Sequence, residues 1–462
     1  MHSPEQVDLY QQSLAQLLQG FSHLPDWSSA PLNQDAAQVL QRTAERLHDN
    51  FPYHHPFYLG QMLKPPHPVA QMAYTLAMCL NPNNHALDGG RASSAMELEC
   101  IAQLAAMFGW TEHLGHLCGG GTMANFEALW VARELTGGHA VAASAHAHYT
   151  HSRLSRVLNV PFVTVPVDRA GRMDLAALEH ILQTEQIGTV VATLGTTGLG
   201  AVDPLDRIVA LRERFGFRLH VDSAYGGYFG LAGNLRPESA RAYAALKHAD
   251  SIVIDPHKHG LQPYGCGCIL FRDRRVAAIY HHESPYTYFT SDDLHLGEIS
   301  LECSRAGASA VALWATLQAF PLVREGEFAR NLERGREAAL KLVEWIDAQP
   351  RLRPVVVPEL DIVVWMVQAE TASQSSEFAQ QIFDAAARRE IHLAQLTLSR
   401  DFLAPLAAIE EWDQPSLKCM RATVMKPEHL AWMSRILERL AEATHEVFAS
   451  PPHPCNQVRG PG

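Results

Sequence analysis

The chain has 462 residues, of which 47% are hydrophobic and 19% are charged, and its formal net charge is −12. This length predicts one large and one smaller domain, and the composition is ordinary for a globular enzyme. The negative charge argues against nucleic-acid binding, because phosphate contacts need clustered Lys and Arg. The polar first residues and the lack of apolar runs approaching about 18 residues predict no signal peptide and no membrane span, and hence a cytoplasmic protein.

Eight cysteines and 25 histidines make a metal site worth considering. Cys266 and Cys268 are close together, but no second cysteine pair stands at zinc-ligand spacing. His146, His148 and His151 are also close in the sequence, which alone is a weak signal. We therefore expect no metal, and we expect reduced, buried thiols.

Apolar residues recur at helical spacing between residues 5 and 50, which predicts amphipathic helices there. From about residue 90 to 320, helical patterns alternate with strand patterns. Helices are expected at 96–108, 124–135, 175–183, 204–215 and 306–320, and strands at 140–143, 162–167, 189–194, 218–221, 251–254 and 266–271. This alternation predicts a largely parallel sheet with helices on both faces, whose ligands bind at the carboxyl ends of the strands.

A smaller α/β domain is predicted to follow. Its helices are expected at 328–348, 376–389 and 428–448, and its strands at 361–367 and 418–424. The Pro-rich tail 451–462 is expected to be disordered. The predicted organisation is therefore an N-terminal helical segment, a large domain, a small domain and the tail, with bounds at 1–60, 61–320, 321–450 and 451–462.

Two ionisable residues stand at the ends of predicted strands. Lys258 follows the apolar run 251–254, and Asp222 follows the run 218–221. A lysine held in a cleft and partly desolvated loses its proton more easily, which an amine needs before it forms a Schiff base with an aldehyde. A lysine for an aldehyde and an aspartate for a ring nitrogen are the pair that pyridoxal phosphate (PLP) requires.

The motifs Asp222-x-Ala224 and Asp-Pro-His-Lys, which ends at Lys258, resemble those of the group II PLP-dependent amino-acid decarboxylases. The resemblance covers most of the chain, from about residue 55 to 427. It implies the PLP-dependent transferase-like fold (fold type I), an α/β fold whose large domain holds a mostly parallel seven-stranded sheet. It also implies a homodimer with the active site at the subunit interface, in which the N-terminal helical segment packs on the partner subunit.

A glycine-rich run stands before the predicted helix 124–135. Backbone N–H groups of such a run and the amino terminus of the helix favour an anion such as a phosphate, although the run alone is more typical of a flexible turn. It resembles the phosphate loop of the family, which implies that Gly120, Gly121 and Thr122 bind the phosphate. The family often has Ser where this chain has Gly119, which leaves one phosphate hydrogen bond open.

The same resemblance places residues around the pyridine ring. It implies that His148 stacks on the ring and approaches the substrate carboxylate, and that Ala224 lies under the ring. As an anion, Asp222 would keep the ring nitrogen protonated and make the ring an electron sink. Thr196 and Thr197 are expected to hydrogen-bond near the ring.

Two residues beside Lys258 are also expected at the cofactor. His257 could contact the phosphate or guide protons. Asp255 stands where the family commonly has Asn, and the sequence gives no reason for an extra negative charge near the phosphate.

PLP alone permits several reactions, and the resemblance favours decarboxylation over transamination. The catalytic loop is expected at about 280–296, with Tyr288 as the residue that protonates the carbanion and Tyr286 as the alternative. A phenylalanine at that position, such as the adjacent Phe289, would indicate an oxygen-consuming aldehyde synthase. A non-catalytic PLP-binding protein is a further alternative, which the presence of both Lys258 and Asp222 argues against.

The substrate is predicted from three residues that match family positions near the substrate. They are Gln61, Lys64 and Arg421. An Arg and a Lys around a small site favour a second carboxylate, so an acidic amino acid, L-aspartate or L-glutamate, is the leading prediction. The alternatives are that Lys64 is a surface residue and that Phe57 and Tyr58 form an apolar slot for an aromatic substrate such as tyrosine.

Overall fold

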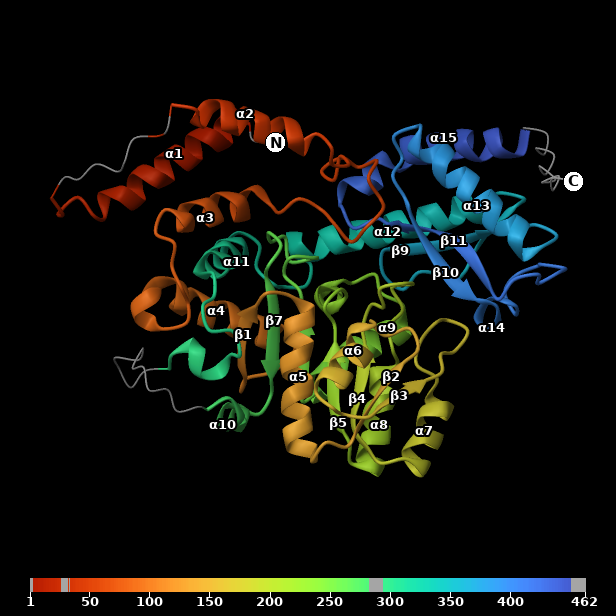
Figure 1. Cartoon of the computed structure of the whole chain (residues 1–462), viewed down its shortest axis with the longest axis horizontal. Coiled ribbons are helices and arrows are strands. Elements are labelled where there is room, and N and C mark those ends of the chain that lie inside the picture. The colour runs from red at the N-terminus through yellow and green to blue at the C-terminus, as the bar shows by residue number, and fades with distance from the viewer. Residues whose placement is uncertain (1–2, 26–31, 33, 282–293, 450–462) are drawn as a thin grey trace, which may run out of the picture.

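The computed structural model of the chain describes residues 3–25, 32, 34–281 and 294–449. Two β-sheets organise it (Figure 1). The larger sheet has seven strands in the order β1-β7-β6-β5-β4-β2-β3. These strands are β1 (Leu114–Cys118), β2 (Ala140–Ser144), β3 (Phe162–Val165), β4 (Ile187–Thr193), β5 (Arg218–Asp222), β6 (Ser251–Ile254) and β7 (Gly267–Phe271).

The large sheet is mostly parallel, as predicted. Neighbouring strands from β3 to β6 pair in parallel, and β7 alone runs antiparallel to both of its neighbours. Asp222, the last residue of β5, pairs with Thr193 at the end of β4 and with Val253 of β6. The carboxyl ends of these strands therefore meet at one edge of the sheet.

Largely apolar sequence explains the buried strands β2, β4 and β6. Every residue of β2 and β6 is buried, and so is every residue of β4 after the first. Parallel strands that are covered on both faces need such runs, because neither face meets water. The expected strands at 140–143, 189–194, 218–221 and 251–254 are therefore confirmed to within two residues at either end.

Helices cover the large sheet, and this unit is called the large domain below. In Figure 1, α5 lies across the face of the sheet, where it packs against β4 to β7. Helices α3, α4 and α11 pack together beside β1. The helices of the large domain are α3 (Pro68–Met78), α4 (Arg91–Met107), α5 (Gly121–Thr136), α6 (Thr150–Val157), α7 (Leu175–Thr184), α8 (Leu205–Phe215), α9 (Pro237–Ala244), α10 (Ala277–Tyr280) and α11 (Gly307–Ala319).

The second sheet is antiparallel and has the order β10-β11-β9-β8; with its helices it is called the small domain. Its strands are β8 (Leu352–Pro354), β9 (Ile362–Val367), β10 (Ala394–Ser399) and β11 (Ser416–Thr423). Its helices are α12 (Glu327–Asp347), α13 (Ala372–Ala387), α14 (Arg400–Leu403) and α15 (Glu428–Ala449). Phe57 and Leu59 pack into its core. The predicted domain bounds at 60, 320 and 450 stay a proposal.

The predicted N-terminal helices are present as α1 (Pro4–Gln19) and α2 (Ala36–Leu47). They lie along one side of the molecule above α3 (Figure 1). Ser3 begins α1 with a capping box, in which its hydroxyl and the Gln6 side chain each accept a backbone N–H. Neither helix contains a buried residue in this single chain.

Two further findings concern the described ranges alone. No helix there combines the length and the apolarity that crossing a membrane requires. No group of three or more His, Cys, Asp or Glu side chains in those ranges is arranged to hold a metal ion. Cys266 and Cys268 are buried and form no disulfide.

Candidate active site

A cavity of about 640 Å³ opens at the carboxyl ends of the parallel strands. Its walls come from the segments that follow β1, β2, β4, β5 and β6. Open α/β sheets bind their ligands at this edge, because the loops there converge. The cavity brings together all the predicted cofactor residues except Thr196: Gly120, Gly121, Thr122, His148, Thr197, Asp222, Ala224, Asp255, His257 and Lys258.

The turn between β1 and α5 has the geometry of an anion site. Gly120 has a φ of 145°, a conformation that favours glycine. A Cβ on Gly121 would lie only 2.8 Å from Asp255 Oδ2, so the backbone can approach this closely only without a side chain. Helix α5 begins at Gly121 without a side-chain cap, which leaves its first N–H groups for a ligand.

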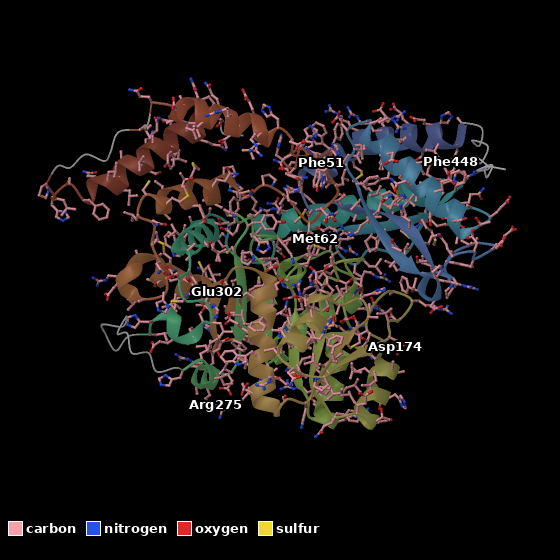
Figure 2. The ribbon with its side chains drawn as sticks, viewed as in Figure 1. Phe51, Met62, Asp174, Arg275, Glu302 and Phe448 are labelled. Carbon is pink, nitrogen blue, oxygen red and sulfur yellow. The ribbon has the colours of Figure 1, made fainter. Side chains whose placement is uncertain are left out.

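The backbone N–H of Gly119, where the family often has Ser, is hydrogen-bonded within the protein. Its N–H donates to Glu302 Oε2 at 3.0 Å. Glu302 lies on the segment that leads into α11, on the side of α5 away from the small domain (Figure 2). Residue 119 therefore offers the phosphate neither a hydroxyl nor its backbone N–H.

Asp222 is fixed as an anion at the end of β5. His151 Nε2 donates to its Oδ2 at 2.9 Å, and the Ala224 N–H donates to its Oδ1 at 3.1 Å. Burial opposes ionisation of this carboxyl, but the His151 hydrogen bond and the charge of Lys258 outweigh it and hold the pKa of Asp222 well below its usual range. A carboxylate that stays charged inside a cavity suits a protonated ring nitrogen.

Lys258 faces Asp255 across a distance of 3.0 Å between Nζ and Oδ2. Burial tends to lower the pKa of Lys258, but the charges of Asp255 and Asp222 overcome it and raise the pKa above its ordinary value. In the protein without cofactor, these two charges outweigh the expected effect of desolvation on the pKa of Lys258. The ion pair with Asp255 is the physical reason, and it keeps the amine protonated.

The Asp255→Asn variant is expected to capture PLP about tenfold faster at neutral pH. Asparagine keeps the shape of the side chain but removes the charge that raises the pKa of Lys258, and one nearby opposite charge shifts a pKa by about one unit or more. Rapid mixing of apoprotein with PLP, followed by visible absorbance across pH, measures this rate. Pyridoxal, which lacks the phosphate, should show the same acceleration; an effect on PLP alone would mean that Asp255 acts by repelling the phosphate.

The remaining cofactor residues have defined contacts. Burial lowers the pKa of His148, against the opposing charge of Asp222, and its Nδ1 accepts the Thr150 N–H at 3.2 Å. His257 Nδ1 lies 2.8 Å from the Cys266 carbonyl oxygen. Thr196 does not line the cavity, because it is buried and its hydroxyl accepts the Ala201 N–H. Of the two threonines, Thr197 therefore lines the cavity where the ring is predicted, and Thr196 does not.

The three predicted substrate residues do not line this cavity. Gln61 is exposed. Lys64 lines a second cavity, of about 670 Å³, together with Lys426, and burial lowers the pKa of Lys64 to about 8. Arg421 is buried, and its guanidinium donates to the carbonyl oxygens of Gly60, Thr197 and Gly198, at 3.3, 2.8 and 3.2 Å. The described residues therefore do not bring these three side chains into one carboxylate pocket. Arg421 is hydrogen-bonded to backbone carbonyl oxygens, and Lys64 lines a separate cavity.

Tyr288 and its alternative Tyr286 lie outside the described residues. Their predicted role in protonating the carbanion stays a prediction.

Sequence reasoning missed several residues in or beside the cavity. His151 does not line the cavity but contacts Asp222, and the sequence suggested it only as a metal ligand. Tyr264 lines the cavity, and its hydroxyl donates to the carbonyl oxygen of Met62 at the junction with the small domain (Figure 2). Tyr225, three residues after Asp222, lines it as well.

Comparisons with known proteins agree with this geometry. The sequence model described as the pyridoxal-dependent decarboxylase conserved domain matches residues 32–367. An L-tyrosine decarboxylase of Enterococcus faecium is 28% identical over 460 residues, which cover 75% of each chain. A probable L-tyrosine/L-aspartate decarboxylase of Methanothermobacter thermautotrophicus is 30% identical over 323 residues, 66% of this chain and 82% of the relative. A crystal structure of mouse CSAD has the same fold, with a TM-score of 0.78 and 20% identity over 96% of this chain and 99% of that chain.

The residues of the cavity fit PLP. The glycine turn before α5 suits its phosphate, and Lys258 suits its aldehyde. When bound, PLP supplies an electron sink for the electrons of a broken bond at the amino-acid Cα. Asp222 holds a negative charge at the cavity wall, and partial burial lowers the pKa of His148. The family model spans more than half of the chain, which therefore belongs to the pyridoxal-dependent decarboxylases and is a PLP-dependent carboxy-lyase of amino acids.

Proposed function

We propose that this decarboxylase acts on an aromatic L-amino acid, with L-tyrosine as the leading substrate. The charge of the cofactor cavity carries the proposal. Among the described residues that line it, Lys258 is the only Lys or Arg, whereas Asp222, Asp255 and Glu302 are acidic. A second substrate carboxylate would meet these acids without a cation beyond the lysine that serves the cofactor, which makes its desolvation costly.

The rest of the cavity wall supports an aromatic side chain. Met123, Phe126, Leu154 and Tyr264 contribute apolar and aromatic surface to it. Sites for small ligands are commonly lined in this way, with a few polar groups that fix orientation. The relative from Enterococcus faecium is named an L-tyrosine decarboxylase.

An acidic amino acid, aspartate or glutamate, is the second candidate, and it was the first choice from the sequence. Arg421 favours it, because only three of its five N–H donors bind carbonyl oxygens, and one of those oxygens belongs to Thr197, which lines the cavity. The Methanothermobacter relative is named for both tyrosine and aspartate. Lys64, the other cation of the acidic-pocket argument, lies in the second cavity.

A direct comparison of kcat/KM for L-tyrosine, L-aspartate and L-glutamate tests this order. We expect tyrosine to exceed both acids by at least about tenfold, since a site without the matching charge leaves a buried carboxylate unpaired. A preference for aspartate that disappears in Lys64→Ala would contradict the proposal and return Lys64 to the substrate site. Carbon dioxide and hydrogen peroxide are measured together, because peroxide formed in step with carbon dioxide would indicate an aldehyde synthase.

We also propose the homodimer that the family resemblance implies, with the active site at the interface. Support comes from α1 and α2, whose apolar side chains are exposed in the single chain and need a partner surface. These exposed side chains are Val7, Leu9, Leu18, Val39, Leu40 and Leu47. A cytoplasmic location stays a prediction from the sequence.

A further inference from the structure

A buried carboxylate joins the small domain to the cofactor cavity. Asp361 is the residue before β9, and it is fully buried. Its Oδ1 accepts a hydrogen bond from the Tyr225 hydroxyl at 2.6 Å. Its Oδ2 lies 3.3 Å from His259 Nε2. One carboxylate of the small domain thus meets two side chains of the large domain.

The two large-domain partners sit on the loops that carry the central residues of the site. Tyr225 lies three residues after Asp222 and lines the cofactor cavity. His259 is the next residue after Lys258, and its ring lies 4.7 Å from the Tyr225 ring in an edge-to-face arrangement. A shift of Asp361 would therefore be transmitted to both loops.

This arrangement has a cost in free energy. Asp361 Oδ2 and both ring nitrogens of His259 are buried, and the described residues give them no hydrogen-bond partner of good geometry. Burial raises the pKa of Asp361 to about 6, although the Tyr225 hydrogen bond and the charge of Lys64 lower it. An Asn or an apolar residue would avoid that penalty, so the charge calls for a functional reason.

Helix α12 approaches Asp361 through Gly335, which has no side chain, and the charged and titratable groups around Asp361 come from other segments. They are Lys64 of the N-terminal segment, Tyr225 after β5, Tyr243 of α9, His259 after β6 and Arg421 of β11. Burial keeps the pKa of His259 well below its ordinary value, with Lys64 and Lys258 acting in the same direction. Asp361 is therefore the acidic member of a cluster whose other charged members are cations.

We propose that Asp361 is a positioning residue for decarboxylation: its buried carboxylate, hydrogen-bonded to Tyr225 and close to His259, holds the segment that follows Asp222 and the segment that carries Lys258 in register with the small domain. Asp361 itself does not line the cofactor cavity. Its effect on turnover passes through Tyr225 and His259, because a misplacement of about 1 Å in reacting groups can reduce the rate by about 100-fold.

The chain offers a matched control two residues away. Glu359 is also buried, and its Oε1 accepts the Ser239 hydroxyl of α9 at 2.9 Å. This is the same kind of hydrogen bond across the same domain junction, but neither Ser239 nor Glu359 lines the cofactor cavity. Tyr225→Phe and Ser239→Ala each remove one hydroxyl from a buried carboxylate.

The experiment compares Asp361→Asn, Tyr225→Phe and Ser239→Ala in the full chain. Asparagine can still accept the Tyr225 hydroxyl, so it removes the charge and keeps the shape. We expect Asp361→Asn and Tyr225→Phe to lower kcat by about tenfold with little change in KM, and Ser239→Ala to leave both near wild type. The assay uses whichever of tyrosine, aspartate or glutamate turns over fastest.

The pH profile separates charge from packing. A carboxyl whose pKa is about 6 carries its charge above pH 6 and loses it below, so wild-type kcat should fall on that side and Asp361→Asn should lack this limb. The thermal unfolding midpoint of the apoprotein gives a readout that needs neither substrate nor PLP. Because the folded pKa of Asp361 exceeds its unfolded value, the stability of the wild type should fall as the pH rises from 4 to 6. The stability of Asp361→Asn should not show this fall.

Each outcome decides the matter. Equal losses of kcat in Tyr225→Phe and Ser239→Ala would reduce Asp361 to a structural residue and overturn the proposal. A wild-type pH profile in Asp361→Asn would overturn it as well. If Asp361→Asn does not fold, the comparison of kcat between Tyr225→Phe and Ser239→Ala still tests the proposal. A failure of the substrate proposal does not affect the unfolding measurement, which needs no substrate.

Discussion

The Lys258→Ala protein is expected to bind PLP without covalent attachment and to lose turnover by at least about 1,000-fold. Lys258 is the lysine of the cofactor cavity among the described residues, where it faces Asp255 at 3.0 Å. Borohydride reduction of the wild-type holoenzyme, followed by peptide mapping, should find the cofactor on Lys258. The same treatment of Lys258→Ala should leave the PLP dialysable.

Two other lysines make this a demanding test. Burial lowers the pKa of Lys426 to about 7 and that of Lys64 to about 8, so both amines are freer of protons at neutral pH than Lys258. Basicity alone would therefore direct an aldehyde to them, whereas the cavity directs it to Lys258. Lys64→Ala serves as the matched control, and it should still carry the cofactor at Lys258. Label on Lys64 or Lys426 in the wild type would refute the assignment.

A strand could be predicted from the sequence wherever its own residues showed an apolar pattern. Three of the four residues of the run 251–254 are apolar and the run forms β6, because a covered parallel strand needs apolar residues on both faces. Strand β1 (Leu114–Cys118) was not predicted, since Gly115 and His116 interrupt its apolar pattern. His116 is nevertheless buried, 2.8 Å from Glu127 of α5. That partner follows from the packing of α5 on the sheet, which no local pattern contains.

Some residues of the site could also be predicted from the sequence, and others could not. Lys258 and Asp222 each end a strand, and parallel strands bring their ends to one edge, so their approach could be predicted. The neighbours that set their charges could not. His151 reaches Asp222 from 71 positions away, and the small domain supplies Asp361 from beyond the large sheet. The location of Lys64 in a separate cavity could not be predicted for the same reason, because it depends on how the segment before α3 packs against the residues after β11.

The Asp222→Asn variant is expected to fold and bind PLP but to lose turnover by about 100-fold or more, or about 3 kcal/mol of transition-state stabilisation. Asparagine keeps the shape of the side chain and can still accept the Ala224 N–H, but it cannot carry the charge that suits a protonated ring nitrogen. Measured kcat and the visible absorbance of bound PLP should change together. Because the pKa of Asp222 lies below its usual range, the wild-type charge persists through the acidic range in which the protein can be assayed.

His151→Gln is the graded companion of this variant. A glutamine amide can donate from near the position of Nε2, so Asp222 would keep its charge and both of its donors, and turnover should fall by less than in Asp222→Asn. Asp222→Glu keeps the charge but moves it by one methylene, which tests distance separately from charge. If Asp222→Asn retained near-normal turnover, Asp222 would not face the ring nitrogen, and the His151–Asp222 pair would be a structural element of the sheet edge. A loss in Asp222→Asn that exceeds the losses in both companions would instead tie the rate to the charge at the end of β5.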